Sequence, residues 1–158
     1  MSETDYTARL ATRDDANAIV EFNLAMARET ESLELSPATL ASGVNHLFDN
    51  PHFGFYVMAE ARAAGGAVEC AGSLMITYEW SDWRDGLFWW VQSVYVRAEH
   101  RRRGVYTVLY EFVKQLAAAD PRVRGFRLYV ERENAPAQKT YERLGMNTSH
   151  YVMYEEII

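Results

Sequence analysis

The chain of 158 residues carries 16 basic and 22 acidic side chains, which gives a formal net charge of −6, and 49% of its residues are hydrophobic. These values fit one globular domain with a continuous core, and no apolar run approaches the roughly 18 residues of a membrane helix. The acidic excess argues against nucleic acid as the partner, because duplex binding draws its affinity from positive charge at phosphates.

The cysteine and histidine content and the first residues bear on location and metal binding. Cys70 is the only cysteine, so no disulfide forms within the chain, and the four histidines show no metal-ligand spacing. The acidic opening over residues 1–5 lacks the basic-then-apolar order of a secretory signal. We therefore expect a single cytoplasmic domain over residues 1–158, with no metal and no membrane partner.

Two helices are predicted in the first third of the chain. Thr12 is typical of a helix start, and apolar residues follow it at helical spacing as far as Ala27. Ser36–Pro37 places a capping residue before a proline at the first helical position, and this second helix is expected to end near Asn50–Pro51.

Three consecutive strands are predicted next, because β-branched and aromatic residues dominate Phe55–Glu60, Cys70–Tyr78 and Leu87–Val96. Gly65–Gly66 and Asp85–Gly86 separate them and supply the positive φ of tight hairpins, so the strands should be antiparallel. The third strand is almost continuously apolar, which predicts burial on both faces.

The second half alternates helices and strands. Apolar spacing predicts a helix over Val105–Leu116, followed by a strand at Phe126–Val130, a helix between the N-cap Asn134 and Gly145, and a last strand at Ser149–Ile158. The strand Leu87–Val96, the helix that follows it and the strand Phe126–Val130 should form a βαβ unit with parallel strands. The fold class is therefore α/β, with a mixed central sheet flanked by helices on both faces.

The turn Arg101–Gly104, between the third strand and its helix, is typical of an anion-binding site. The first amides of a helix lack internal partners and carry the positive end of its dipole, and Gly104 lets a ligand approach the backbone. Arginine side chains would add charge-assisted bonds to phosphate oxygens. The alternative is a solvated helix start, but basic charge opposes the helix dipole there unless an anion is bound.

A second motif lies about 30 residues later, in the run Asn134–Met146. Together with the Arg-x-x-Gly turn at Arg101 and Gly104, this run resembles the GNAT superfamily of N-acetyltransferases across most of the chain. The family pattern places a small residue where this chain has Tyr106, whose ring must point away from a bound pyrophosphate.

The resemblance implies acetyl-CoA as co-substrate, bound where two parallel strands splay apart. The third strand would pair with the pantetheine through its backbone, the amides after Arg101 would hold the pyrophosphate, and Asn134 would contact the cofactor or simply cap its helix. The residues expected at the cofactor are Val94, Tyr95, Val96, Arg101, Arg102, Arg103, Gly104, Val105, Tyr106, Thr107 and Asn134.

Tyr141 matches the family's tyrosine that donates a hydrogen bond to the cofactor sulfur. Attack of an amine on a thioester expels a thiolate, and a phenol with a pKa of about 10 can protonate that sulfur. Helical spacing with Ala137 and Leu144 alone would instead make Tyr141 a core residue.

The attacking amine must also lose a proton. No carboxylate lies within Leu87–Val96, so the general base must come from elsewhere or from a water ordered by Gln92 and Ser93. The carboxylate candidates, with Glu79 first, are Glu79, Asp82, Glu29, Glu31 and Glu131.

All four tryptophans fall between positions 80 and 90. Trp89 and Trp90 should point to opposite faces of their strand. Trp80 and Trp83 flank the hairpin and, with Glu79 and the nearby acids, would form a pocket for a cationic amine. The residues expected to bind the acceptor are Glu31, Trp80, Asp82 and Trp83, and the alternative for this hairpin is a homodimer contact.

These observations predict an acyltransferase that moves an acetyl group directly from acetyl-CoA to a primary amine of a small molecule or peptide. Two other interpretations stay open. A GNAT fold without transferase activity would act as a CoA-binding or regulatory module, and a nucleic-acid module would use Arg101 to Arg103.

Overall fold

The computed structural model of the protein describes residues 4–158, so residues 1–3 of the acidic opening lie outside the described part. The chain forms two compact units, one ending at Leu128 and the other running from Tyr129 to Ile158. One domain over residues 1–158 stays a prediction. Within residues 4–158, no helix combines the length and apolar character needed to cross a membrane.

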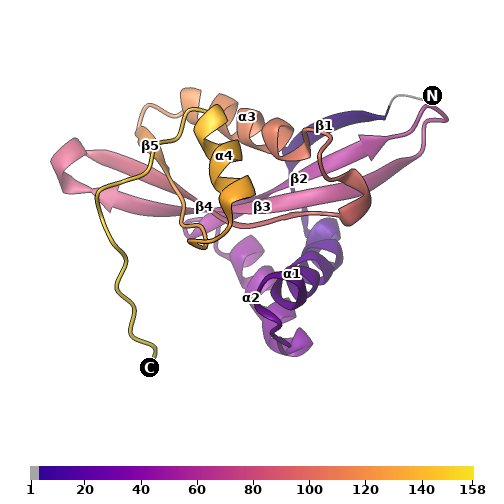
Figure 1. The fold of residues 1–158 in the computed structure, drawn as a ribbon, viewed down its shortest axis with the longest axis horizontal. Helices are drawn as coiled ribbons and strands as arrows, with labels where there is room; N and C mark the ends of the chain where they lie inside the picture. The colour runs from indigo at the N-terminus through magenta and orange to yellow at the C-terminus, as the bar shows by residue number, and fades with distance from the viewer. Residues whose placement is uncertain (1–3) are drawn as a thin grey trace. The chain divides into compact units, whose positions relative to one another are not determined.

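The first unit is a five-stranded sheet with three helices, drawn in Figure 1. The strands are β1 (Asp5–Leu10), β2 (Gly54–Arg62), β3 (Val68–Ser81), β4 (Gly86–Val96) and β5 (Val123–Arg127), in that spatial order. The helices are α1 (Ala16–Glu31), α2 (Pro37–Asp49) and α3 (Val105–Ala118). Strands β1 to β4 pair antiparallel and β4 pairs parallel with β5, so the predicted mixed sheet and the βαβ unit are confirmed.

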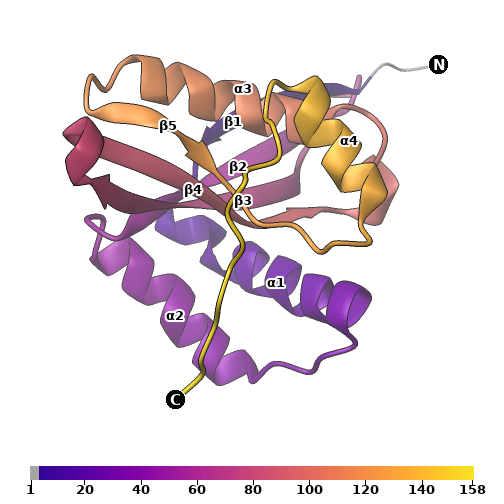
Figure 2. The ribbon, with the colours of Figure 1, turned by 60° about the vertical axis from the view of Figure 1, so that its left-hand side comes forward.

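Helices cover both faces of this sheet. Helices α1 and α2 lie on one face and α3 on the other, as Figure 2 shows. On the α1 and α2 face, Ile19, Phe22, Val44 and Met58 belong to one buried cluster. This burial follows from the helical spacing of apolar residues and fixes α1 against the sheet.

The predicted helix starts are confirmed by their caps. The backbone amide and the hydroxyl of Thr12 donate to Asp15 Oδ2 at 2.8 and 3.4 Å, and a short 3-10 turn leads into α1. Ser36 Oγ accepts from the Thr39 amide at 3.2 Å at the start of α2. Capping of this kind satisfies amides that have no partner inside the helix.

The hairpin before β4 uses its two turn residues differently from the prediction. Asp85, with φ of 45°, takes the left-handed conformation, whereas Gly86 does not. A Cβ on Gly86 would lie 2.4 Å from the carbonyl oxygen of Arg122. Gly86 is therefore needed for close approach of two backbones and not for a positive φ.

Three further expectations were wrong. Strand β5 begins at Val123 and not at Phe126, because the parallel register with Leu87 starts there. Residues 149–158 form no strand and are exposed. In β4 only Gly86, Trp89 and Val91 are buried, so the strand is not buried on both faces.

Sequence reasoning also missed β1, which pairs with β2 along its whole length.

The single thiol, Cys70 of β3, is half-buried, and burial raises its pKa above the ordinary value, with a smaller contribution from the charge of Asp15.

Candidate active site

Within residues 4–128, no strand pairs with the C-terminal half of β4 on its β5 side. Pairing with β5 runs only from Leu87 to Trp90, whereas β4 continues to Val96 and stays paired with β3 on its other side. The parallel pairing therefore covers only the first part of β4, in agreement with the splayed pair that the resemblance implied. The backbone of Val94, Tyr95 and Val96 follows the last β5 contact. The Val96 carbonyl accepts from Arg101 Nε, so the backbone before that carbonyl is the part left to pair with an extended ligand.

A bulge lies within this part of β4, and sequence reasoning missed it. Gln92 pairs with Met75 and Tyr95 with Ser73, so two residues of β4 oppose Leu74, and Ser93 has a φ of 50°. Because Ser73 and Met75 lie on one face of β3, Gln92 and Tyr95 share that face too. A bulge depends on the register between strands, and a single strand's sequence carries no signal for it.

The turn after β4 leads into α3 with two residues in the left-handed region. Arg102 has a φ of 61° and Gly104 a φ of 81°. The amide of Val108 donates to the Gly104 carbonyl at 3.1 Å, so the amides of Val105 to Thr107 precede the first such bond of the helix. A Cβ on Gly104 would meet no atom within 4 Å. The turn therefore presents helix amides next to open space, which suits a phosphate.

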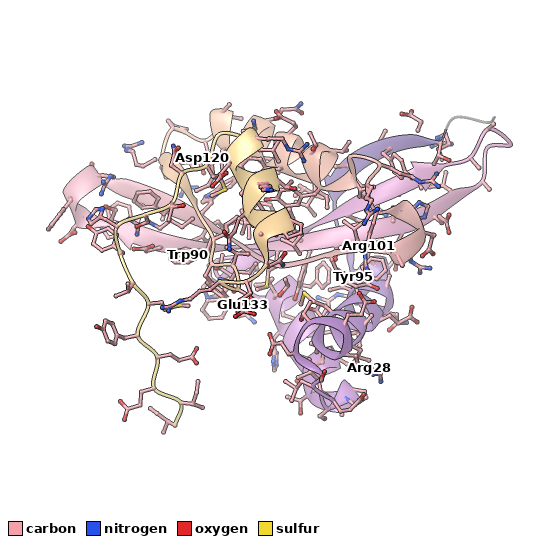
Figure 3. All side chains as sticks on the ribbon, in the orientation of Figure 1. Arg28, Trp90, Tyr95, Arg101, Asp120 and Glu133 are labelled. Atoms are coloured by element: carbon pink, nitrogen blue, oxygen red, sulfur yellow. The ribbon has the colours of Figure 1, made fainter. Side chains whose placement is uncertain are left out.

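The side chain of Arg101 binds to other groups of the protein. Its Nε donates to the Val96 carbonyl at 2.9 Å, its Nη2 meets Glu29 Oε2 of α1 at 2.5 Å, and its guanidinium lies 5.4 Å from the centre of the Tyr95 ring. Figure 3 shows Tyr95 and Arg101 close together. The Tyr95 hydroxyl donates to Glu29 Oε1 at 3.0 Å. The Arg101 guanidinium holds the pKa of Glu29 below its usual value.

The neighbouring side chains of the turn are placed differently. Arg102, Arg103 and Thr107 are exposed and Val105 is buried. The Tyr106 ring stacks on Tyr110, one helical turn later, with ring centres 6.0 Å apart, and its hydroxyl is buried. Tyr106 thus packs along α3, while its amide stays in the first turn of the helix.

The second unit carries the remaining residues of the family motif. Helix α4 (Ala135–Arg143) begins after Asn134, whose Oδ1 accepts from the Ala137 amide at 3.2 Å, so Asn134 is an N-cap. Tyr141 is half-buried, and burial raises its pKa above the ordinary value. Its phenol therefore stays protonated at neutral pH, as a proton donor must.

A second carboxylate and guanidinium pair lies nearer the start of β4. Trp90 Nε1 donates to Glu79 Oε2 at 2.6 Å, and Arg127 Nη1 donates to both Glu79 oxygens at 2.8 and 2.9 Å. The Arg127 guanidinium stacks 3.8 Å from the centre of the Phe88 ring. Burial acts to raise the pKa of Glu79, but the bonds from Trp90 and Arg127 outweigh it and leave that pKa below its usual value.

The structure does not gather all the residues predicted at the acceptor. Glu79 and Trp80 are consecutive in β3, so they point to opposite faces, and the indole that meets Glu79 is that of Trp90. Trp83, 86% exposed, lies at the tip of the hairpin.

The other acids predicted at the candidate site differ in their surroundings. Asp82 Oδ1 accepts from the Trp83 amide at 2.9 Å. Glu31 is exposed at the end of α1, and Glu131 accepts from the Glu133 amide in the second unit.

Comparisons with known proteins identify the family and the fold. Residues 17–146 match the family model of the Acetyltransferase (GNAT) family. The chain is similar to a protein described as a possible acetyltransferase from Clostridium difficile 630, with 40% identity, a TM-score of 0.85 and 97% of each chain covered. No curated protein matches the chain.

More distant structures share the fold. A glucosamine-6-phosphate N-acetyltransferase from Arabidopsis thaliana is 13% identical, with a TM-score of 0.71 and 98% of this chain and 99% of that one covered. A transcriptional regulator from Bacillus halodurans C-125 is 19% identical, with a TM-score of 0.76 and 97% and 100% covered. The same fold therefore occurs in proteins with different described roles.

Proposed function

Because the chain belongs to the GNAT acetyltransferase family, we propose that it transfers an acetyl group from acetyl-CoA directly to a primary amine. The observation that carries the proposal is the part of β4 beyond its β5 pairing, which leads within one turn to the outward amides of α3. An extended chain ending in a pyrophosphate fits this sequence of unpaired backbone groups.

In this proposal the backbone of Val94 to Val96 pairs with the pantetheine, and the amides that follow Arg102 hold the pyrophosphate. Gly104 leaves space for the phosphate, since a Cβ there would point into open space. Arg102 and Arg103 lie beside the turn with exposed side chains and supply positive charge to the phosphate oxygens.

The reaction proposed for this site is direct attack. The neutral amine nitrogen bonds to the thioester carbonyl carbon, the carbon–sulfur bond breaks, and Tyr141 gives its phenolic proton to the departing thiolate. Burial raises the pKa of Tyr141, so the phenol keeps that proton until the thiolate forms. Water then returns a proton to Tyr141.

On the acceptor side we propose that Glu79 binds the cationic amine and that the amine proton leaves through water. A carboxylate whose pKa is lowered by two donors remains an anion but is a weak base, and the amine has to compete with Arg127 for its oxygens. Gln92, whose amide donates to Thr77 Oγ1 at 2.6 Å, and Ser93 in the bulge lie between the two ends of β4 and could order that water.

The experiment is a screen of amines with acetyl-CoA, following release of the free thiol and the mass of the product. Small polyamines, amino acids, aminoglycosides and peptide amines form the panel. We expect thiol release to depend on one class of amine, and acetyl-CoA alone gives the background rate.

Two other outcomes would replace the proposal. Calorimetric binding of CoA without thiol release for any amine would indicate a binding or regulatory module, for which the fold shared with a described transcriptional regulator gives a precedent. Salt-sensitive DNA binding that acetyl-CoA does not alter would indicate the nucleic-acid module.

We further propose a cytoplasmic protein, with a homodimer through the Trp80 and Trp83 hairpin as the alternative use of that surface.

A further inference from the structure

We infer that Arg101 is a positioning residue that shapes the cofactor turn by clamping it to α1, and is not a ligand of the cofactor phosphates. The clamp consists of Arg101, Glu29, Tyr95 and the carbonyl of Val96. The effect of the clamp on cofactor affinity rests on the proposed function, whereas its contacts are observed in the structure and do not depend on that function.

The clamp joins three parts of the first unit. Arg101 reaches back to the last carbonyl of β4 at Val96 and across to Glu29 near the end of α1. Tyr95 completes it, because its hydroxyl donates to Glu29 while its ring lies against the guanidinium. Phe22 of α1 packs against the same Tyr95 ring, with centres 5.4 Å apart. Helix α1 is thus fixed to the strand end from which the turn departs.

The charge of Arg101 is already balanced. Two of its three guanidinium nitrogens donate to protein oxygens, and one of these oxygens belongs to the ionised carboxylate of Glu29. A phosphate would have to compete with that carboxylate for the same donors. The next two residues, Arg102 and Arg103, are exposed and better placed to supply free positive charge.

The clamp holds a turn that would not keep its shape unaided. Arg102 has a φ of 61°, a conformation that residues with a side chain rarely adopt, and such conformations persist only when their surroundings hold them. Arg101 directly precedes Arg102, so holding its side chain in the clamp restricts the path that the backbone takes to Gly104. The amides of α3 are then preorganised for an anion, and preorganisation improves affinity without a direct contact.

Removing Glu29 separates this inference from simple electrostatics by the sign of the effect. CoA is a polyanion, so loss of one nearby negative charge should tighten its binding if only charge matters. The clamp predicts the opposite, because the turn would adopt its binding shape only part of the time.

The binding experiment measures the Kd of CoA by calorimetry for the wild type, Glu29→Ala, Glu29→Gln and Glu34→Ala. Glu34 is the matched control, since it loses the same charge from an exposed pair with Arg28 outside the clamp. We expect Glu29→Ala to raise the Kd roughly five- to tenfold, as for a turn correctly shaped a tenth to a fifth of the time. Glu29→Gln should recover most of this loss, because its amide oxygen still accepts from Arg101. Glu34→Ala should change the Kd less than about twofold.

Arg101→Ala and the double variant Arg101→Ala, Glu29→Ala complete the cycle. The double variant should bind CoA about as weakly as Arg101→Ala alone, because both substitutions remove the same clamp. In steady-state kinetics each variant should raise the KM for acetyl-CoA and leave kcat unchanged, whereas general misfolding would lower kcat with the active fraction.

Hydrogen exchange of the unliganded protein tests the clamp without any cofactor. Peptides covering residues 96–108 should exchange faster in Glu29→Ala and Arg101→Ala than in the wild type and in Glu34→Ala. Unchanged exchange, or a Kd that is unchanged or lower in Glu29→Ala, overturns the inference. A wild type that fails to bind CoA overturns the proposed function instead, and the exchange measurement still decides whether the clamp holds the turn.

Discussion

The two ends of β4 are built alike but are open to different degrees. Each end has a carboxylate from another element, an arginine that pairs with it, an aromatic ring against the guanidinium and a ring donor to the carboxylate. At the C-terminal end these are Glu29, Arg101 and Tyr95. At the N-terminal end they are Glu79, Arg127, Phe88 and Trp90.

The difference lies in the backbone. Near Phe88 and Trp90, β4 is paired with β3 on one side and β5 on the other, so all its main-chain groups are used within the sheet. Beyond Trp90 the β5 partner is gone, and a helix start with open space follows at Gly104. The same ion-pair chemistry therefore borders a closed sheet at one end and, at the other, the edge where we propose that the cofactor binds.

The largest effect is expected from a residue of the second unit. If both ends of β4 only bind, removing the Tyr141 hydroxyl should leave acetyl-CoA affinity intact and lower turnover by roughly 10² to 10⁴, the usual contribution of a general acid. Single-turnover kinetics and calorimetry on Tyr141→Phe measure the two quantities. Full turnover when chemistry limits the rate would make Tyr141 a packing residue of its helix.

The next effect concerns the open end. Gly104→Glu places a negative charge in the space assigned to the phosphate and should raise the Kd for acetyl-CoA at least about tenfold more than Gly104→Gln does. Both variants share the strain of a side chain at φ of 81°, so the comparison isolates charge. Equal acetyl-CoA affinities of Gly104→Glu and Gly104→Gln by calorimetry would show that the phosphate does not bind at this turn.

Gly86 provides the mirror test at the closed end. A Cβ there would lie 2.4 Å from the Arg122 carbonyl oxygen, so Gly86→Ala forces the two backbones apart and should cost about 1–3 kcal/mol of unfolding free energy. Acetyl-CoA affinity of the folded protein should not change. Gly104→Ala meets no atom and should cost only about 1 kcal/mol through its φ, as denaturant titrations of both variants would show.

The smallest effect on stability is expected at Glu79. Its folded pKa lies below the unfolded value of about 4.3, so its contribution is present above that pH and is lost as the pH falls through the folded pKa. The pair with Arg127 is partly exposed, and Glu79→Gln should cost under about 1 kcal/mol at pH 7 and nothing in strong acid. Chemical denaturation across this pH range measures the difference.

The same variant tests the acceptor role. Glu79→Gln should raise the KM for the amine and leave acetyl-CoA binding unchanged, whereas Glu131→Gln should do little to either. An equal loss in both variants, or none in Glu79→Gln, would move the acceptor toward Glu29 and Glu31.

The sequence predicted what depends on local periodicity and capping. The helices after Ser36 and Asn134 begin where their caps indicated, and α3 follows its apolar stripe. Thr12 caps a 3-10 turn, and α1 begins after it at Ala16. What it could not predict depends on pairing between distant segments. The bulge at Ser93 exists only relative to β3, and residues 149–158 include strand-forming residues but form no strand.

The candidate site follows the same division. The turn at Gly104 was predictable from its residue types, since glycine and arginine at a helix start are a local signal. That Arg101 would face Glu29, 72 residues earlier, was not predictable, because nothing in either segment specifies the other. Likewise Glu79 meets Trp90 and not Trp80, because the alternation of β3 places its neighbour on the other face.

The half-buried thiol of Cys70 has a practical consequence for following the reaction. Thiol reagents react with the thiolate, and burial raises the pKa of Cys70, so little thiolate is present at neutral pH. The protein's own thiol should therefore be labelled more slowly than an exposed free thiol such as the one released from acetyl-CoA. Continuous colorimetric detection of transfer should work on the unmodified chain, and a cysteine introduced on its surface would accept a fluorophore selectively.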